Sequence, residues 1–164
     1  MVDSTECINI IKQMRIKITT NSAVETEKFA EELAGRLRGG EVIELISDLG
    51  GGKTTFVRGL ARGLGSQDRV ASPTFTISKV YQGTNLRLYH FDFYRLSEAG
   101  LIEHELQEIL NEEDVVTVIE WGKIVTDVLP EDRLTVRLTK SGEEKRDIEC
   151  VAPDRLVYMD KDVA

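Results

Sequence analysis

The residues that could do chemistry begin with a glycine-rich stretch, Ser47 to Thr55, which reads SDLGGGKTT. It nearly matches the phosphate-binding pattern G-x-x-x-x-G-K-[ST], whose last three positions are Gly52, Lys53 and Thr54. Only the first position differs, because Ser47 stands where the pattern has glycine. In such a loop the backbone N–H groups surround an anion, the lysine reaches the β- and γ-phosphates, and the Ser/Thr hydroxyl binds Mg²⁺. The stretch therefore predicts a nucleoside triphosphate site.

We expect the loop to contact the nucleotide along most of its length, with the positive end of the following helix facing the phosphates. Ser47 governs the exit from the preceding strand, and its effect on the rate of hydrolysis stays open. The alternative is a chance glycine turn, which the strand–loop–helix context disfavours. The predicted nucleotide-contacting residues of the loop are Asp48, Leu49, Gly50, Gly51, Gly52, Lys53, Thr54 and Thr55.

Two carboxylates stand at the ends of apolar segments, Asp92 in HFDFYR and Glu120 in VIEW. Hydrolysis of a nucleoside triphosphate needs acids that hold the metal and orient the attacking water. Taken singly, each carboxylate could equally be a surface residue. Together with the loop they predict a metal site of Thr54, Glu120 and Asp92, in which Glu120 is the stronger ligand and Asp92 supports the metal or orients the water. The predicted catalytic residues are Lys53, Asp92 and Glu120.

The elements beside the loop follow from hydrophobic periodicity. Residues 15–20 alternate as a half-buried strand does, and Ser22 and Glu25 have capping-box spacing at the start of a helix. That helix is expected to bury Val24, Phe29, Leu33 and Leu37 and to stop at the glycines 39–40. Residues 42–46 form a short apolar strand that enters the loop, and the helix after the loop is expected to lie close to a sheet. The small residues Gly59 and Gly63 of this helix are the reason for that expectation.

The second half of the chain predicts further strands and one helix. Strands are expected at 75–81 and 86–93 as an antiparallel hairpin, at 114–120, and at 133–140 and 145–151 as a second hairpin. Ser97 is expected to cap a helix that runs to about residue 111, and a turn or short helix precedes Pro130. The fold class is α/β: a single domain like a P-loop NTPase, with a mixed, partly parallel sheet, flanking helices and peripheral β-hairpins. It spans residues 14–164, and residues 1–13 form a loosely attached extension.

Composition limits the partners. The 164 residues are 41% hydrophobic and 30% charged, as in a globular protein, and the net charge is −8. An acidic chain is a poor binder of bare nucleic acid, so another protein is the better candidate. Cys7 and Cys150 are far apart and predict unpaired thiols in a reducing compartment. With no apolar run of about 20 residues and no signal-peptide pattern, we expect a cytoplasmic protein that does not contact a membrane.

The ordered set of motifs resembles one family. The segments are DLGGGKTTF from Asp48, SPTFT from Ser72, HFDFYRL from His90, and the Glu120–Trp121 pair. Over about residues 16–150 they resemble TsaE (also called YjeE), the bacterial ATPase family of threonylcarbamoyladenosine tRNA modification. The resemblance implies a P-loop fold, ATP and ADP as ligands, Mg²⁺, and docking on a complex of the TsaD and TsaB proteins. It also implies that the protein resets that complex between turnovers and meets tRNA only through it.

The resemblance further implies roles for individual residues. The Ser-Pro-Thr segment 72–74 becomes a switch-like loop that senses the γ-phosphate, and Trp121 a site-adjacent aromatic residue. His90 is given no catalytic role. The positions added to the nucleotide-binding set are Thr74, Trp121, Thr26 and Arg146, the last two beside the base.

Two other functions fit the same loop. One is a nucleotide-dependent binding module with little turnover, an alternative suggested by Ser47. The other is a small-molecule kinase, which is disfavoured because no second arginine-rich lid segment is found. ATP is favoured over GTP because the guanine-reading Asn/Thr-Lys-x-Asp pattern is missing: residues 139–142 begin similarly but lack the acid.

Overall fold

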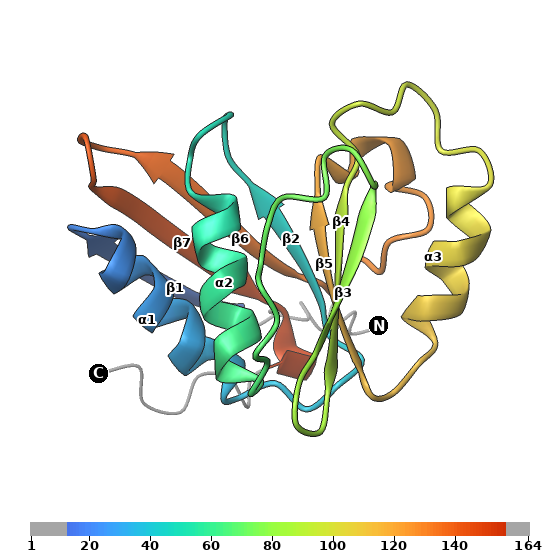
Figure 1. Cartoon of the computed structure of the whole chain (residues 1–164), viewed down its shortest axis with the longest axis horizontal. Coiled ribbons are helices and arrows are strands. Elements are labelled where there is room, and N and C mark those ends of the chain that lie inside the picture. Colours follow the sequence, from blue (N-terminus) through green and yellow to red (C-terminus); the bar gives the residue numbers. More distant parts are fainter. Residues whose placement is uncertain (1–12, 157–164) are drawn as a thin grey trace, which may run out of the picture.

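The computed structural model describes residues 13–156, in which strands and helices alternate through most of the chain (Figure 1). The predicted extension over residues 1–13 lies almost wholly outside the described residues. The elements in chain order are β1 (Met14–Thr20), α1 (Ala23–Ala34), β2 (Val42–Ile46), α2 (Lys53–Gly63), β3 (Ser78–Gln82), β4 (Arg87–Asp92), α3 (Ile102–Leu110), β5 (Val115–Glu120), the 3₁₀ turn η1 (Gly122–Val125), β6 (Leu134–Lys140) and β7 (Arg146–Ala152).

One seven-stranded sheet runs through the molecule in the order β1-β7-β6-β2-β5-β4-β3. Its centre is parallel, because β2 pairs in parallel with β5 and β6, and β4 pairs in parallel with β5. Antiparallel pairing of β3 with β4 and of β7 with β6 and β1 completes the two sides. The predicted mixed α/β fold and both predicted hairpins are confirmed. Over residues 13–156, none of the helices is long and apolar enough to cross a membrane.

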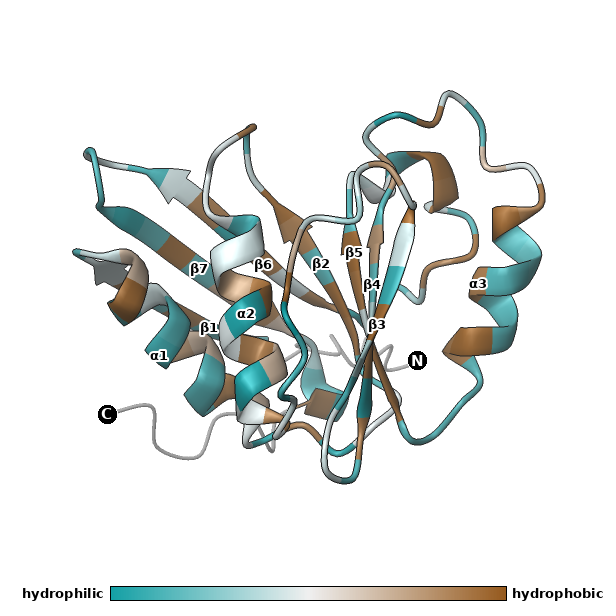
Figure 2. Cartoon of the chain, in the orientation of Figure 1, coloured by the Kyte–Doolittle hydropathy of each residue, from teal (hydrophilic) through white to brown (hydrophobic). Residues whose placement is uncertain are grey.

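Helices cover both faces of the central strands. Successive side chains of a strand point to opposite faces, so a strand made of apolar residues presents an apolar surface on each face. Val116 and Val118 of β5 join the core under α1 and α2, whereas Val115 and Ile119 join the core under α3. All six residues of β5 are buried, and Figure 2 shows the apolar residues concentrated on these central strands. A strand buried on both faces is typical of the parallel centre of an α/β sheet. This arrangement leaves the ends of the central strands as the place for a ligand.

Helix α1 begins at the predicted cap. The Ser22 hydroxyl accepts a hydrogen bond from the Glu25 backbone N–H at 3.2 Å, and the Glu25 carboxylate accepts one from the Asn21 backbone N–H at 2.7 Å. The expected burial of Val24 is wrong, since its side chain is 73% exposed. The buried stripe instead runs through Thr26, Phe29, Ala30, Leu33 and Ala34, at the spacing of one helix face. The helix also ends earlier than predicted, at Ala34, ahead of the glycines 39–40.

Gly59 and Gly63 of α2 face α1, so the expectation that they bring this helix close to a sheet is wrong. A Cβ atom on Gly59 would lie 2.2 Å from the Glu27 carbonyl oxygen, and one on Gly63 would lie 2.5 Å from that of Glu31. The two helix backbones therefore approach more closely than larger side chains permit. Ion pairs bridge the same contact: Arg58 to Glu27 at 2.7 Å, and Arg62 to Glu31 at 2.8 Å.

Two predicted elements start later than expected. Strand β3 begins at Ser78 because the backbone N–H groups of Thr76 and Ile77 both donate to the Pro73 carbonyl oxygen, which makes residues 73–77 a turn. Helix α3 begins at Ile102, and Ser97 does not cap it. Gly100, with a φ of 52°, precedes that start and interrupts the helical geometry. Both differences move residues from regular elements into loops.

Candidate functional site

The glycine loop joins the end of β2 to the start of α2, at the top of Figure 1. Gly50 and Gly52 have φ angles of 72° and 103°, a left-handed conformation that favours glycine. Gly52 is also the residue before the first turn of α2, and no side chain caps that helix end. The free backbone N–H groups and the positive end of α2 therefore face the loop, which is the arrangement that binds phosphate.

Lys53 is folded back onto its own loop. Its ammonium group donates to the Ser47 carbonyl oxygen at 3.1 Å and to the Asp48 carbonyl oxygen at 3.0 Å. The side chain is mostly buried, and its nitrogen lies 4.9 Å from the centre of the Trp121 ring, a cation–π contact. The loop thus holds a positive charge at its centre, and its partners within residues 13–156 are two neutral acceptors and an aromatic face.

Ser47, the departure from the phosphate-binding pattern, is accommodated inside the loop. A Cβ atom on Gly51 would lie 1.6 Å from the Ser47 hydroxyl oxygen, so the serine side chain occupies the space beneath Gly51. That hydroxyl is buried and has no hydrogen-bond partner among residues 13–156. The serine therefore fits only because Gly51 carries no side chain.

The carboxylates at the strand ends meet beside this loop. Asp92 of β4 and Glu120 of β5 are register partners in the parallel pairing, and β2 ends next to β5. Both carboxylates are buried, with exposures of 4% and 3%. They line one cavity of about 380 Å³ with the loop. Its lining residues are Leu49, Gly50, Gly51, Gly52, Lys53, Thr54, Thr55, Ser72, Thr74, Asp92, Tyr94, Glu120, Trp121 and Arg146.

This cavity contains all but two of the residues predicted for the site. Asp48 does not line it, although its carbonyl oxygen binds Lys53. Thr26 lines an adjoining hollow of about 220 Å³ together with Gly52, Thr55 and Arg146. The Thr26 hydroxyl lies 2.7 Å from that of Thr20, a buried pair that joins the end of β1 to α1.

Asp92 is held by the segment that precedes β3. Its Oδ2 accepts hydrogen bonds from the hydroxyls of Thr74 at 2.9 Å and Ser72 at 3.2 Å, and these two hydroxyls lie 2.6 Å apart. Its Oδ1 accepts from the Tyr94 backbone N–H at 3.0 Å. The segment 72–74 therefore contacts the acid directly, which is the position that a loop responding to the nucleotide needs.

Glu120 is bound by a residue to which sequence reasoning gave no role. The Nε2 atom of His90 lies 2.7 Å from Glu120 Oε1, and the histidine is fully buried. The signal was present in the sequence: His90 stands two residues before Asp92, so both side chains point to the same face of β4. A polar residue that is buried on that face is expected to hydrogen-bond another polar group.

Arg146 and Trp121 close the cavity from two sides. Arg146, the first residue of β7, donates from Nε to the Gly51 carbonyl oxygen at 2.9 Å and so ties the C-terminal hairpin to the loop. Trp121 follows Glu120 in a left-handed conformation with a φ of 57°. That conformation is uncommon for a residue with a side chain and is found at functional sites more often than elsewhere. The ring packs against Tyr94, with 5.0 Å between ring centres.

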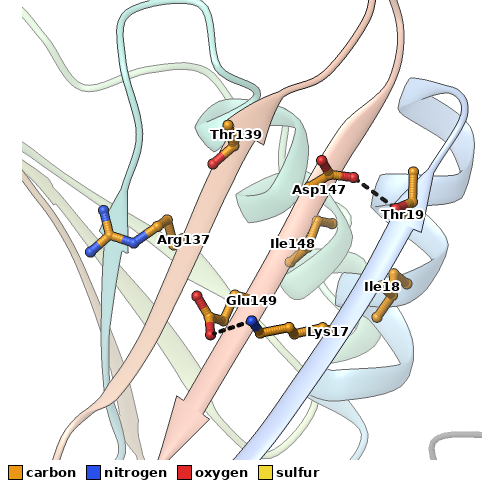
Figure 3. Close-up of a pocket in the computed structure, with 8 residues that line it drawn as sticks. All are labelled: Lys17, Ile18, Thr19, Arg137, Thr139, Asp147, Ile148 and Glu149. Carbon is orange, nitrogen blue, oxygen red and sulfur yellow. Dashed lines mark hydrogen bonds and ion pairs between the residues drawn. The ribbon is translucent and has the colours of Figure 1, made fainter.

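A larger hollow of about 470 Å³ lies elsewhere, on the face of β1, β7 and β6 shown in Figure 3. Two pairs of its polar side chains meet across the strands: Thr19 donates to Asp147 at 2.7 Å, and Lys17 lies 3.5 Å from Glu149. It has neither a helix N-terminus nor a glycine loop. Despite its smaller volume, the cavity at the glycine loop has the chemistry expected of a nucleotide site.

The donor set at the loop suits a magnesium ion that arrives with its nucleotide. Among residues 13–156 there is no group of three or more His, Cys, Asp or Glu side chains that could hold a metal by themselves. The hydroxyl of Thr54 and the carboxylates of Glu120 and Asp92 share one cavity, and all are oxygen ligands. Mg²⁺ prefers such a site, in which one or two carboxylates act together with substrate phosphates. The residues present therefore fit the ion.

Comparison with known proteins gives one consistent result. The family model described as "Threonylcarbamoyl adenosine biosynthesis protein TsaE" matches residues 20–148. The protein of that name from Bacillus subtilis is 37% identical over 138 residues, which cover 84% of this chain and 86% of the relative. The one from Treponema pallidum is 39% identical over 137 residues, which cover 81% and 98%.

A solved structure shares the fold. The crystal structure of YdiB from Bacillus subtilis superimposes with a TM-score of 0.77 at 33% sequence identity, over 92% of this chain and 94% of that one. Family membership and fold thus rest on nearly the whole described chain.

Proposed function

Because the chain belongs to the TsaE family, we propose that it is a magnesium-dependent ATPase of tRNA threonylcarbamoyladenosine biosynthesis. The relatives that match most of its length carry that biosynthesis in their names. The modified adenosine lies next to the anticodon. The ATPase acts with a complex of TsaD and TsaB, which it resets between turnovers.

The observation that carries the proposal is the shared cavity. A glycine loop with its lysine and two strand-end carboxylates come from three separate parts of the sequence and line one space of about 380 Å³. Within residues 13–156, Lys53 donates to carbonyl oxygens and Asp92 accepts from neutral donors, and buried charges that lack an opposite charge are costly. A triphosphate would bring negative charge to the lysine, and its metal would bring positive charge to the acids.

The roles follow from where each side chain lies. The ammonium group of Lys53 exchanges the carbonyl oxygens of Ser47 and Asp48 for phosphate oxygens, which are stronger acceptors because they are charged. Thr54 and Glu120 would hold the Mg²⁺, and Asp92 would support it or orient the water. The ion, when bound, neutralises charge on the β- and γ-phosphate oxygens. The segment 72–74 is proposed to sense the γ-phosphate, and the hydrogen bonds from the hydroxyls of Ser72 and Thr74 to Asp92 support this role.

Arg146 and Thr26 are proposed to border the base, because they line the hollow of about 220 Å³ that adjoins the loop. ADP occupies the same site after hydrolysis. The partners are proteins: with a net charge of −8, the chain meets tRNA through the TsaD–TsaB complex. We place this reaction in the cytoplasm.

Phosphate release from Mg-ATP, measured for the chain alone and with the TsaD–TsaB pair, tests the proposal. We expect slow release alone and faster release with the pair. Tight binding of ATP with no release in either condition would instead identify a binding module. Release that requires an added small-molecule acceptor would identify a kinase.

A further inference from the structure

Among residues 13–156, His90 is the side chain that hydrogen-bonds the carboxylate of Glu120. Its Nε2 atom lies 2.7 Å from Glu120 Oε1, and the two residues are 0% and 3% exposed. They reach each other diagonally: the register partner of His90 on β5 is Val118, two residues before Glu120 on the same face. The Glu120 carboxylate therefore points towards β4 and towards the start of its own strand.

The two nitrogen atoms of His90 differ in their surroundings. Nδ1 is buried and has no hydrogen-bond partner within residues 13–156. A carboxylate that binds a cation is ionised and can only accept hydrogen bonds, so Nε2 carries the hydrogen and donates it to Oε1. An imidazole with one nitrogen unsatisfied costs free energy in a core, because a buried acceptor without a partner is unfavourable. An apolar residue would avoid that cost, so packing alone does not explain the histidine.

We infer that His90 is a positioning residue that fixes the carboxylate of Glu120 for the magnesium ion. The inference rests on the proposed function, since it assigns the ion to Glu120. The hydrogen bond occupies Oε1 and leaves Oε2 as the oxygen that faces the ion or its water. Ligands that are oriented by a second hydrogen bond bind metal more strongly, because less freedom is lost when the ion arrives.

Asp92 is oriented differently. Its hydrogen bonds come from Ser72, Thr74 and the Tyr94 backbone, all in loop segments. Glu120 is bound by a side chain on the neighbouring strand, within the core. The contact from a strand therefore belongs to the acid expected to be the stronger metal ligand, and the contacts from loop residues belong to the acid beside the segment 72–74.

The test is calorimetric and needs no turnover. ATP affinity is measured with Mg²⁺ and with EDTA for the native chain, His90→Leu and His90→Gln, and the ratio of the two affinities is the magnesium-dependent gain. We expect His90→Leu to reduce this gain about 10-fold without changing affinity in EDTA. The Gln variant retains an N–H donor and should recover part of the gain.

Glu120→Gln completes a double-mutant cycle, and Val118→Ala serves as the matched control. In the Glu120→Gln background, His90→Leu should have no further effect, because a positioning residue acts only through the residue it positions. Val118→Ala truncates the register partner of His90 but keeps both members of the hydrogen-bonded pair, and should keep the native gain. If His90→Leu folds poorly, the Gln variant alone supplies the cycle.

The outcomes separate the two proposals. A native chain that binds ATP with a magnesium-dependent gain that His90→Leu and His90→Gln leave unchanged would overturn the positioning role alone. An equal loss in the native and Glu120→Gln backgrounds would overturn it too, since the effect would not pass through Glu120. A native chain that binds no ATP would overturn the proposed function.

Discussion

At the scale of single residues, Ser47 and Gly51 share one space. The serine hydroxyl lies where a Cβ atom of Gly51 would be, and it makes no hydrogen bond to any residue in the range 13–156. The Ser47 side chain therefore fills the space beneath Gly51 and makes no polar interaction there. The phosphate contacts expected from the backbone and from Lys53 do not depend on it.

Ser47→Gly should accordingly leave the affinity for Mg-ATP within about 1.4 kcal/mol, a factor of 10. Gly51→Ala is the informative companion, because its methyl group would collide with the Ser47 side chain and distort the loop. It should weaken binding strongly, and adding Ser47→Gly should restore part of the loss. Calorimetric titration measures all four proteins. If the native chain binds no ATP and Ser47→Gly binds it well, the native loop has lost its binding function.

At the scale of elements, the contact between α1 and α2 depends on two glycines. Gly59 and Gly63 let the helices approach until a single added carbon atom would overlap backbone oxygens of α1. Since α2 starts at the loop, this contact also fixes the direction in which the N-terminal end of the helix meets the glycine loop.

Gly59→Ala should lower the free energy of unfolding by about 2 kcal/mol, because overpacking outweighs the better helix propensity of alanine. Gly35→Ala is the matched control. Its φ is −61°, and the nearest atom to an added Cβ atom, other than its chain neighbours, is 3.5 Å away. It should be neutral or slightly stabilising. Urea denaturation followed by circular dichroism measures both variants, and equal stabilities would contradict the close-packing argument.

Most elements could be predicted from the sequence, because strands β1, β2 and β5 and the cap of α1 depend on local patterns. Elements decided by distant contacts could not. The element that Gly59 faces is α1, which lies about 30 residues away in the sequence. The register that sets Glu120 beside His90 depends on the pairing of β4 with β5. The late start of β3 depends on a turn at Pro73 whose hydrogen bonds leave no periodic signal.

At the scale of the whole molecule, the core under α1 and α2 extends from the strands of the site to β7. Cys150 lies in β7 within that core and is fully buried. Burial, with a smaller contribution from Glu149, raises the pKa of its thiol from 9.0 to about 12. As expected for the part of the chain described, this cysteine is unpaired; Cys7 lies outside the described residues.

The raised pKa predicts how stability changes at high pH. The folded state keeps the thiol protonated while the unfolded state loses the proton above pH 9, so this contribution is full below pH 9 and is lost as pH rises towards 12. By about pH 10.5 the native chain should lose about 2 kcal/mol more than Cys150→Ala does. Urea denaturation at several pH values measures the difference. Parallel curves for the two proteins would contradict the assigned burial.

The motifs predict the carboxylates and the lysine as site residues, and the sheet topology explains why they line one cavity. Asp92 and Glu120 are 28 positions apart in sequence but paired in register, at the end of the sheet where β2 enters the loop. The histidine behind Glu120 was missed because a lone buried histidine is more often structural, and only its contact shows the partner.

The most direct test of the account is the binding of Mg-ATP by the native chain and by Lys53→Ala, measured by calorimetry. Arg58→Ala is the control, because it removes another cation from the same helix, one that binds Glu27 and lies outside the cavity. The account predicts binding by the native chain and by Arg58→Ala, and strongly weakened binding by a folded Lys53→Ala. Equal affinity in all three proteins would contradict the assignment of the glycine loop as the phosphate site.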